Sequence, residues 1–226
     1  GTKDGRAFAS FEQAEPMPAY LLTAVCAELS TIEAEWNGKS VRYLVPVGSE
    51  EAVGRSMGKT PLMIEHFSQR TGVPYPWPRY DQVVVWDFIF GGMENTGCTT
   101  MTDLLLVDEK AVLDWDPDGL VAHELAHQWF GDLVTCQDWS QGWLNESWAT
   151  FMEAVWWEED RDADEAIWYR YTTQGEYLEE YQGRYRRPLV AYHFREPIDV
   201  FDRTLYQKGS CVLWTLRGIV GAEAFW

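Results

Sequence analysis

Two histidines and a glutamate in one short segment have the spacing of a hydrolytic metal site. The segment is His123-Glu124-Leu125-Ala126-His127, and it lies in a stretch, 120–130, with the apolar period of a helix. On a helix, residues four apart lie about 40° from each other around the axis and about 6 Å along it. Both imidazoles can therefore bind one zinc ion. The carboxylate of Glu124 lies beside that ion and can take a proton from the water that the metal activates.

A catalytic zinc takes three protein ligands and keeps a fourth position for water. Glu146 is the candidate third ligand, because the loop 131–142 leaves enough chain to end one helix and begin another beside it. Asn145 is a candidate N-cap of that second helix, which places Glu146 in the first turn, where the helix dipole favours a carboxylate. The other nearby acids lie too close to the first helix or two turns beyond Glu146: Asp132, Asp138 and Glu153.

The elements that must position these residues change from strand to helix along the chain. Three segments have the apolar pattern of strands: 19–25, 41–47 and 83–90. A polar turn is expected at Asn37-Gly38 between the first two. Three other segments have the period or the end signals of helices: 50–71, 120–130 and 146–159. This order indicates an α+β fold, with a mixed sheet in the N-terminal half and helices in the C-terminal half.

The composition narrows the class of protein. With 226 residues, of which 46% are hydrophobic, the chain can bury the core of one large domain. The net charge of −18 disfavours nucleic acid and anionic membrane surfaces as partners. No apolar run approaches the roughly 18 residues of a membrane span, and the first residues lack the apolar stretch of a signal peptide. The compartment is therefore unknown from the sequence.

Several separated segments resemble one enzyme family, the gluzincin aminopeptidases, which include aminopeptidase N and leukotriene hydrolase. The segment 123–135 resembles the zinc helix of that family, and 143–146 resembles its third-ligand segment. Gly91-Gly92-Met93-Glu94-Asn95 resembles its exopeptidase signature, usually written GAMEN. A fourth, weaker match is 206–210, Tyr-Gln-Lys-Gly-Ser, which resembles its tyrosine segment. Their joint occurrence in this order is more specific than any one motif.

The resemblance implies a thermolysin-like domain with one zinc ion per chain, bound by His123, His127 and Glu146. Glu124 would act as general base and then general acid, and Tyr206 would stabilise the oxyanion. Glu94 would bind the α-ammonium of the substrate. Its neighbours Gly91, Gly92, Met93 and Asn95 would bind the peptide, whose backbone the glycines allow to approach closely. The implied function is zinc-dependent removal of the N-terminal residue from peptides with a free N-terminus.

The chain departs from the family pattern at Gly92 and Ser210, where alanine is usual, and at Ser147, where glycine is usual. These departures bear on specificity more than on activity. The resemblance also implies domain boundaries: 1–24 is expected to end a preceding β domain, and 25–226 is expected to be the catalytic domain, truncated at its C-terminus. The β and helical domains that flank it in longer proteins are then its partners.

Two other functions remain open at this stage. A zinc endopeptidase of thermolysin type shares the His-Glu-x-x-His segment but does not need Glu94 to bind an ammonium group. A non-catalytic peptide-binding domain would keep the fold in this truncated form without turnover. Gly92, which the leukotriene hydrolase branch shares, also leaves an epoxide hydrolase side activity open.

Overall fold

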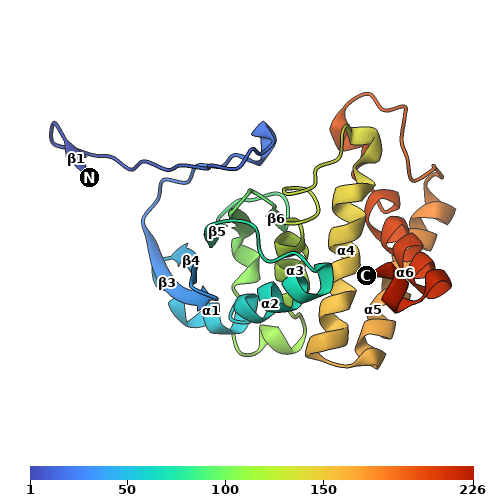
Figure 1. Ribbon diagram of the computed structural model, residues 1–226. Coiled ribbons are helices and arrows are strands. Elements are labelled where there is room, and N and C mark those ends of the chain that lie inside the picture. The colour runs from blue at the N-terminus through green and yellow to red at the C-terminus, as the bar shows by residue number, and fades with distance from the viewer.

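The computed structural model describes all 226 residues, which form an N-terminal arm, a five-stranded sheet and a group of helices (Figure 1). The arm, residues 1–28, is mostly exposed and extends beyond the body. It contains only the two-residue strands β1 (Thr2–Lys3) and β2 (Arg6–Ala7) and a 3₁₀ turn at Ala19–Leu21. The assignment of 1–24 to a preceding β domain stays a prediction.

The sheet is mixed and has the order β3-β4-β5-β7-β6. Its strands are β3 (Leu29–Trp36), β4 (Lys39–Pro46), β5 (Tyr80–Val85), β7 (Cys98–Thr102) and β6 (Gly92–Met93). Strands β3 and β4 form an antiparallel hairpin, and β5 pairs in parallel with both β4 and β7. Asn37 and Gly38 join the hairpin with φ angles of 48° and 76°, which a two-residue turn of this kind requires. The short β6 lies at the edge, antiparallel to β7.

The predicted strand at 19–25 is wrong, because the partner of β4 is 29–36. Of the apolar residues in 19–25, only Leu21 is buried, and Leu22 is 70% exposed. The predicted strand at 83–90 begins three residues earlier and ends at Val85, where the pairing with β7 also ends. The chain then turns through Asp87, whose φ angle is 55°. Beyond Val85 the apolar run has no neighbouring strand to pair with, and it therefore leaves the sheet.

Most helices lie in the second half of the chain, and two lie earlier, between residues 50 and 71. They are α1 (Glu50–Ser56), α2 (Thr60–Thr71), α3 (Asp118–Ala126), α4 (Trp143–Asp160), α5 (Ala163–Gly183), α6 (Gly209–Val220) and α7 (Ala222–Phe225). Short 3₁₀ turns occur at Asp103–Leu105, Ala111–Leu113, Trp139–Gln141 and Pro197–Val200, and a π turn occurs at Thr204–Lys208. None of the helices is both long and apolar enough to span a membrane. The α+β class, with a mixed sheet before the helices, is confirmed.

Several details of the helices differ from the sequence prediction. The helix expected at 120–130 runs from Asp118 to Ala126, and α5 and α6 were not predicted. The single helix expected at 50–71 is two helices, because the chain bends so sharply that a Cβ at Gly58 would lie 2.4 Å from the carbonyl oxygen of Gly54. Helix α4 begins at Trp143 with Gly142 as its N-cap, so the prediction that Asn145 caps this helix is wrong. Asn145 lies inside the first turn, where its side chain is used for tertiary contacts.

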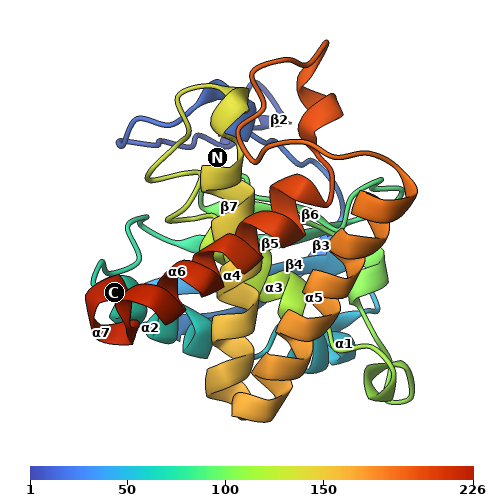
Figure 2. The ribbon, with the colours of Figure 1, turned by 90° about the vertical axis from the view of Figure 1, so that its right-hand side faces the viewer.

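The core lies between the sheet and the helices. Helix α3 packs against both α2 and α4, and α4 also packs against α5 and α6. Figure 2 shows α4 and α5 next to each other in front of the sheet, with α6 crossing α4. On α3, Val121, Ala122, Leu125 and Ala126 are completely buried and belong to the core cluster of 27 residues. Helix α3, which carries His123 and has His127 as its C-cap, is therefore anchored by its apolar residues.

Leu125→Ala should lower the free energy of unfolding by about 2–5 kcal/mol, because it removes buried apolar atoms of α3 and leaves a cavity in the core. Urea unfolding followed by circular dichroism measures this loss. The matched control is Leu113→Ala, since Leu113 is 83% exposed, and it should change stability by less than about 0.5 kcal/mol. Equal losses in the two variants would contradict the burial of α3.

Candidate metal centre and active site

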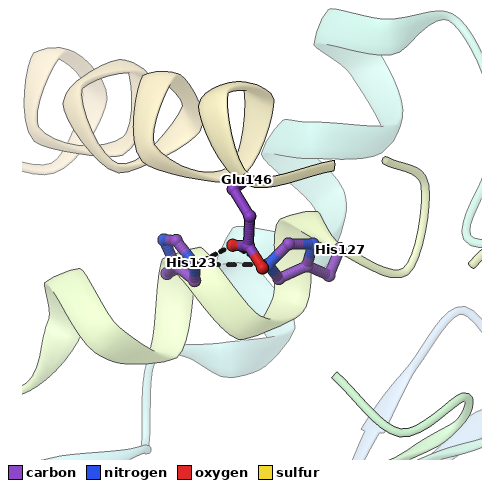
Figure 3. Close-up of side chains that lie close together, drawn as sticks. All are labelled: His123, His127 and Glu146. Carbon is purple, nitrogen blue, oxygen red and sulfur yellow. Dashed lines mark hydrogen bonds and ion pairs between the residues drawn. The ribbon is translucent and has the colours of Figure 1, made fainter. Parts of the chain in front are cut away.

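His123, His127 and Glu146 bring one side-chain atom each to a common point between α3 and α4 (Figure 3). The two Nε2 atoms lie 3.2 Å apart, and Oε2 of Glu146 lies 3.3 Å from Nε2 of His123 and 3.1 Å from Nε2 of His127. Ligand atoms at the corners of a tetrahedron around zinc, with bonds of about 2.0–2.1 Å, lie about 3.3 Å from one another. These three residues therefore fit a zinc ion in both chemistry and spacing.

The electrostatics of the three residues favour a positive charge at that point. Burial by itself would raise the pKa of Glu146, but the neighbouring imidazoles outweigh it and hold that pKa at about 2. Burial would lower the pKa of His127, yet the carboxylates of Glu146 and Glu94 raise it to about 9. A buried anion thus stabilises a cation beside it, and a divalent metal ion supplies that charge in place of protons.

Both imidazoles are oriented by a hydrogen bond from their other ring nitrogen. Nδ1 of His123 donates to Oε1 of Glu153 at 2.6 Å, and Nδ1 of His127 donates to the carbonyl oxygen of Phe130 at 2.9 Å. The second carboxylate oxygen of Glu153 accepts a hydrogen bond from the hydroxyl of Tyr169. Such bonds fix the tautomer and the ring orientation of a metal-binding histidine.

The hydrogen bond of Glu153 to His123 was missed by the sequence reasoning, which considered this side chain only as a competing metal ligand. A signal was available in the sequence. Glu153 follows Glu146 by two helical turns, so both side chains project from nearly the same face of α4.

Glu124 lies beside the three residues, with its carboxyl group buried and one oxygen, Oε2, without a hydrogen-bond partner. Burial raises the pKa of Glu124 to about 8. The backbone of Gly92 lies so close that a Cβ there would be 2.5 Å from Cδ of Glu124. The structure therefore brings the edge strand β6 against the carboxyl group that the sequence analysis expects to act as the base.

Glu94 follows β6 directly and lies at the same site. Its carboxylate, that of Glu124 and a ring nitrogen of His127 are all within 4.8 Å of one another. Burial raises the pKa of Glu94.

The next residue, Asn95, is buried, and both ends of its side-chain amide bind protein groups. Nδ2 donates to the carbonyl of Leu21 at 3.1 Å, and Oδ1 accepts from the hydroxyl of Thr100 at 2.7 Å. Asn95 therefore holds the arm next to Glu94.

Tyr206 reaches the site from the π turn that precedes α6. Its ring centre lies 6.0 Å from that of His123. Burial and then the carboxylates of Glu146, Glu124 and Glu94 raise the pKa of Tyr206 well above its usual value, so the phenol keeps its proton. The structure thus brings together side chains from the residue after β6, from α3 and its C-cap, from α4 and from the π turn.

A tyrosine of the N-terminal arm also lies at this site. The hydroxyl of Tyr20 accepts a hydrogen bond of 3.3 Å from Nδ2 of Asn145, and its ring packs on Trp139 with 5.2 Å between the ring centres. Oδ1 of Asn145 accepts from the backbone N–H of Cys136 at 3.2 Å. These bonds brace the first turn of α4 beside Glu146. The sequence analysis missed Tyr20 because it assigned this segment to the preceding domain.

The chain is similar in sequence to several known proteins. Aminopeptidase M1-A of Oryza sativa subsp. japonica is 33% identical over 95% of this chain and 25% of its own length. Aminopeptidase 2, mitochondrial, of Saccharomyces cerevisiae is 32% identical over 99% of this chain and 24% of its own length. A leukotriene A-4 hydrolase homolog of Botryotinia fuckeliana is 31% identical over 99% of this chain and 34% of its own length. The chain thus spans about a quarter to a third of the length of these relatives.

The family model of the peptidase family M1 domain matches residues 55–226. This range contains β6, α3, α4 and the π turn, and hence every residue of the candidate metal centre. The resemblance that the sequence motifs indicate is confirmed, and the chain belongs to peptidase family M1.

Proposed function

We propose that this chain is the thermolysin-like catalytic domain of a zinc-dependent aminopeptidase, which hydrolyses the N-terminal residue from peptides. The observation that carries the proposal is the convergence of His123, His127 and Glu146 within 3.3 Å of one another. Two of the relatives described above are named aminopeptidases. For the remainder of the longer protein we propose flanking β and helical domains.

His123, His127 and Glu146 would hold one zinc ion. When bound, zinc supplies a Lewis acid that polarises the scissile carbonyl and acidifies the attacking water. Glu124, which has a free carboxyl oxygen beside these residues, accepts the proton of that water and returns it to the leaving amine. Tyr206 remains protonated and donates a hydrogen bond to the oxyanion that develops on the scissile carbonyl.

Glu94 would make the enzyme an exopeptidase. Its carboxylate accepts charge-assisted hydrogen bonds from the α-ammonium of the substrate. Since Glu94 lies within 4.8 Å of Glu124 and His127, an ammonium bound there leaves room for only one residue before the scissile bond. The edge strand β6, which includes Gly92 and Met93 and follows Gly91, is free on one side to pair with the substrate backbone.

Glu124→Gln should retain zinc and lower kcat by about 10²–10⁴-fold, because glutamine keeps the shape of the side chain but cannot accept the proton. The measurements are zinc content by atomic absorption and turnover of an aminoacyl-anilide by the zinc-loaded protein. Loss of zinc from this variant, or near-normal turnover, would refute the role of Glu124.

Glu94→Gln should lower kcat/KM for a dipeptide amide with a free amino group by about 10- to 100-fold, because a buried charge-assisted hydrogen bond is lost. The N-acetylated form of the same dipeptide amide is the control, and the wild-type protein should barely cleave it. Equal cleavage of both forms by the wild type would favour the endopeptidase alternative. Zinc binding without cleavage of either form would favour the non-catalytic peptide-binding alternative.

Glu153→Ala should weaken zinc binding by about 10- to 100-fold, because His123 loses the hydrogen bond that orients its ring. Competition with a chromogenic chelator measures the zinc dissociation constant without any assay of activity. Glu179→Ala is the matched control, since Glu179 is exposed on α5. If both variants bind zinc as the wild type does, Glu153 does not orient His123.

A further inference from the structure

The residue before Tyr206 is held at both of its backbone groups by side chains. The N–H of Leu205 donates to Oδ1 of Asp202 at 2.9 Å, and the carbonyl of Leu205 accepts from Oγ of Ser147 at 2.6 Å. That carbonyl belongs to the peptide bond that leads into Tyr206. Because a peptide unit is rigid and planar, fixing it also fixes the start of Tyr206.

Ser147 connects this peptide to α4, the helix that carries Glu146. It follows Glu146 directly on α4 and is completely buried. A Cβ at Gly209 would lie only 1.7 Å from Oγ of Ser147, so this close approach requires glycine at position 209. The Ser147–Gly209 contact thus sets the distance between the helix that carries Glu146 and the segment that carries Tyr206.

Asp202 is fixed in turn by Arg187. The guanidinium group donates from Nε to Oδ2 of Asp202 at 2.7 Å and from Nη2 to Oδ1 at 2.6 Å. Nη2 also donates to the carbonyl of Val200 at 2.9 Å. A two-point pair of this kind constrains orientation as well as distance. The Asp202 carboxylate is therefore a rigid acceptor for the N–H of Leu205.

The backbone that these contacts fix belongs to the π turn 204–208. Isolated π turns within helices are rare and occur mostly at functional sites. Here the turn contacts helix α4, which carries Glu146, and helix α5. Ser147 and Asp202 bind the turn from outside its own hydrogen-bond ladder and keep its backbone in place.

We propose that Ser147 and the Asp202–Arg187 pair are positioning residues that fix the hydroxyl of Tyr206 relative to the metal ligands. The inference rests on the proposed function, in which Tyr206 stabilises the oxyanion. A hydrogen-bond donor to a developing charge acts only in the transition state, so a displaced Tyr206 lowers kcat and leaves KM unchanged.

Ser147→Ala in the zinc-loaded protein should lower kcat for an aminoacyl-anilide by about tenfold with unchanged KM and zinc content, since small displacements of catalytic groups lower rates strongly. In a Tyr206→Phe background the same substitution should have no further effect on kcat, because no hydroxyl remains to be positioned. The matched control is Ser56→Ala, which removes a completely buried serine of α1 whose Oγ accepts from the N–H of Val107 at 3.1 Å. This control should retain the wild-type kcat.

Hydrogen–deuterium exchange tests the contact independently of activity. Both Ser147→Ala and Arg187→Lys should accelerate amide exchange in residues 203–209, and Ser56→Ala should not. Wild-type exchange in both variants, or an equal loss of kcat from Ser147→Ala with and without the Tyr206 hydroxyl, would overturn the inference. If Tyr206→Phe itself keeps the wild-type kcat, the proposed role of Tyr206 fails, and the exchange result still decides whether Ser147 holds the turn.

Discussion

The structure depends on one constraint: a carboxylate on α4 must lie between two imidazoles, one on α3 and one on the residue that caps its C-terminus. Burying these charges and lone pairs is unfavourable unless each is matched by a partner. Glu146 lies within 3.3 Å of both Nε2 atoms, and each imidazole donates its other nitrogen to a fixed acceptor. This arrangement requires α3 and α4 to face each other. Packing of α3 against α2 and of α4 against α5 and α6 holds them in that position.

The other parts of the site are arranged around the same helix pair. The edge strand β6 brings Gly92 against Glu124, and the buried amide of Asn95 joins this edge to the arm. Ser147 joins α4 to the π turn that carries Tyr206. Gly92 therefore contacts Glu124 of α3 from one segment, and the turn that carries Tyr206 is bound to α4 from another.

The sequence predicted an element correctly where its local residue pattern matched the strand or helix that it packs against in the fold. The hairpin turn at Asn37-Gly38 was predictable because few residues tolerate positive φ angles there. The strand 19–25 was wrong because its apolar residues have no strand to pair with, while the alternating pattern of 29–36 has one. The break near Gly58 and the start of α4 at Trp143 were missed, since each depends on how the chain packs as well as on residue preferences.

The sequence by itself determined that His123 and His127 lie side by side with Glu124 next to them, because positions four apart on a helix are neighbours in any fold that keeps the helix. It also indicated Glu146, Glu94 and Tyr206, through a resemblance of separated motifs. Only the tertiary structure decided that these segments meet, that Glu153 orients His123, and that Tyr20 and Ser147 brace α4 and the π turn. The physical reason is that local periodicity sets distances within one element, whereas distances between elements come from packing and side-chain hydrogen bonds.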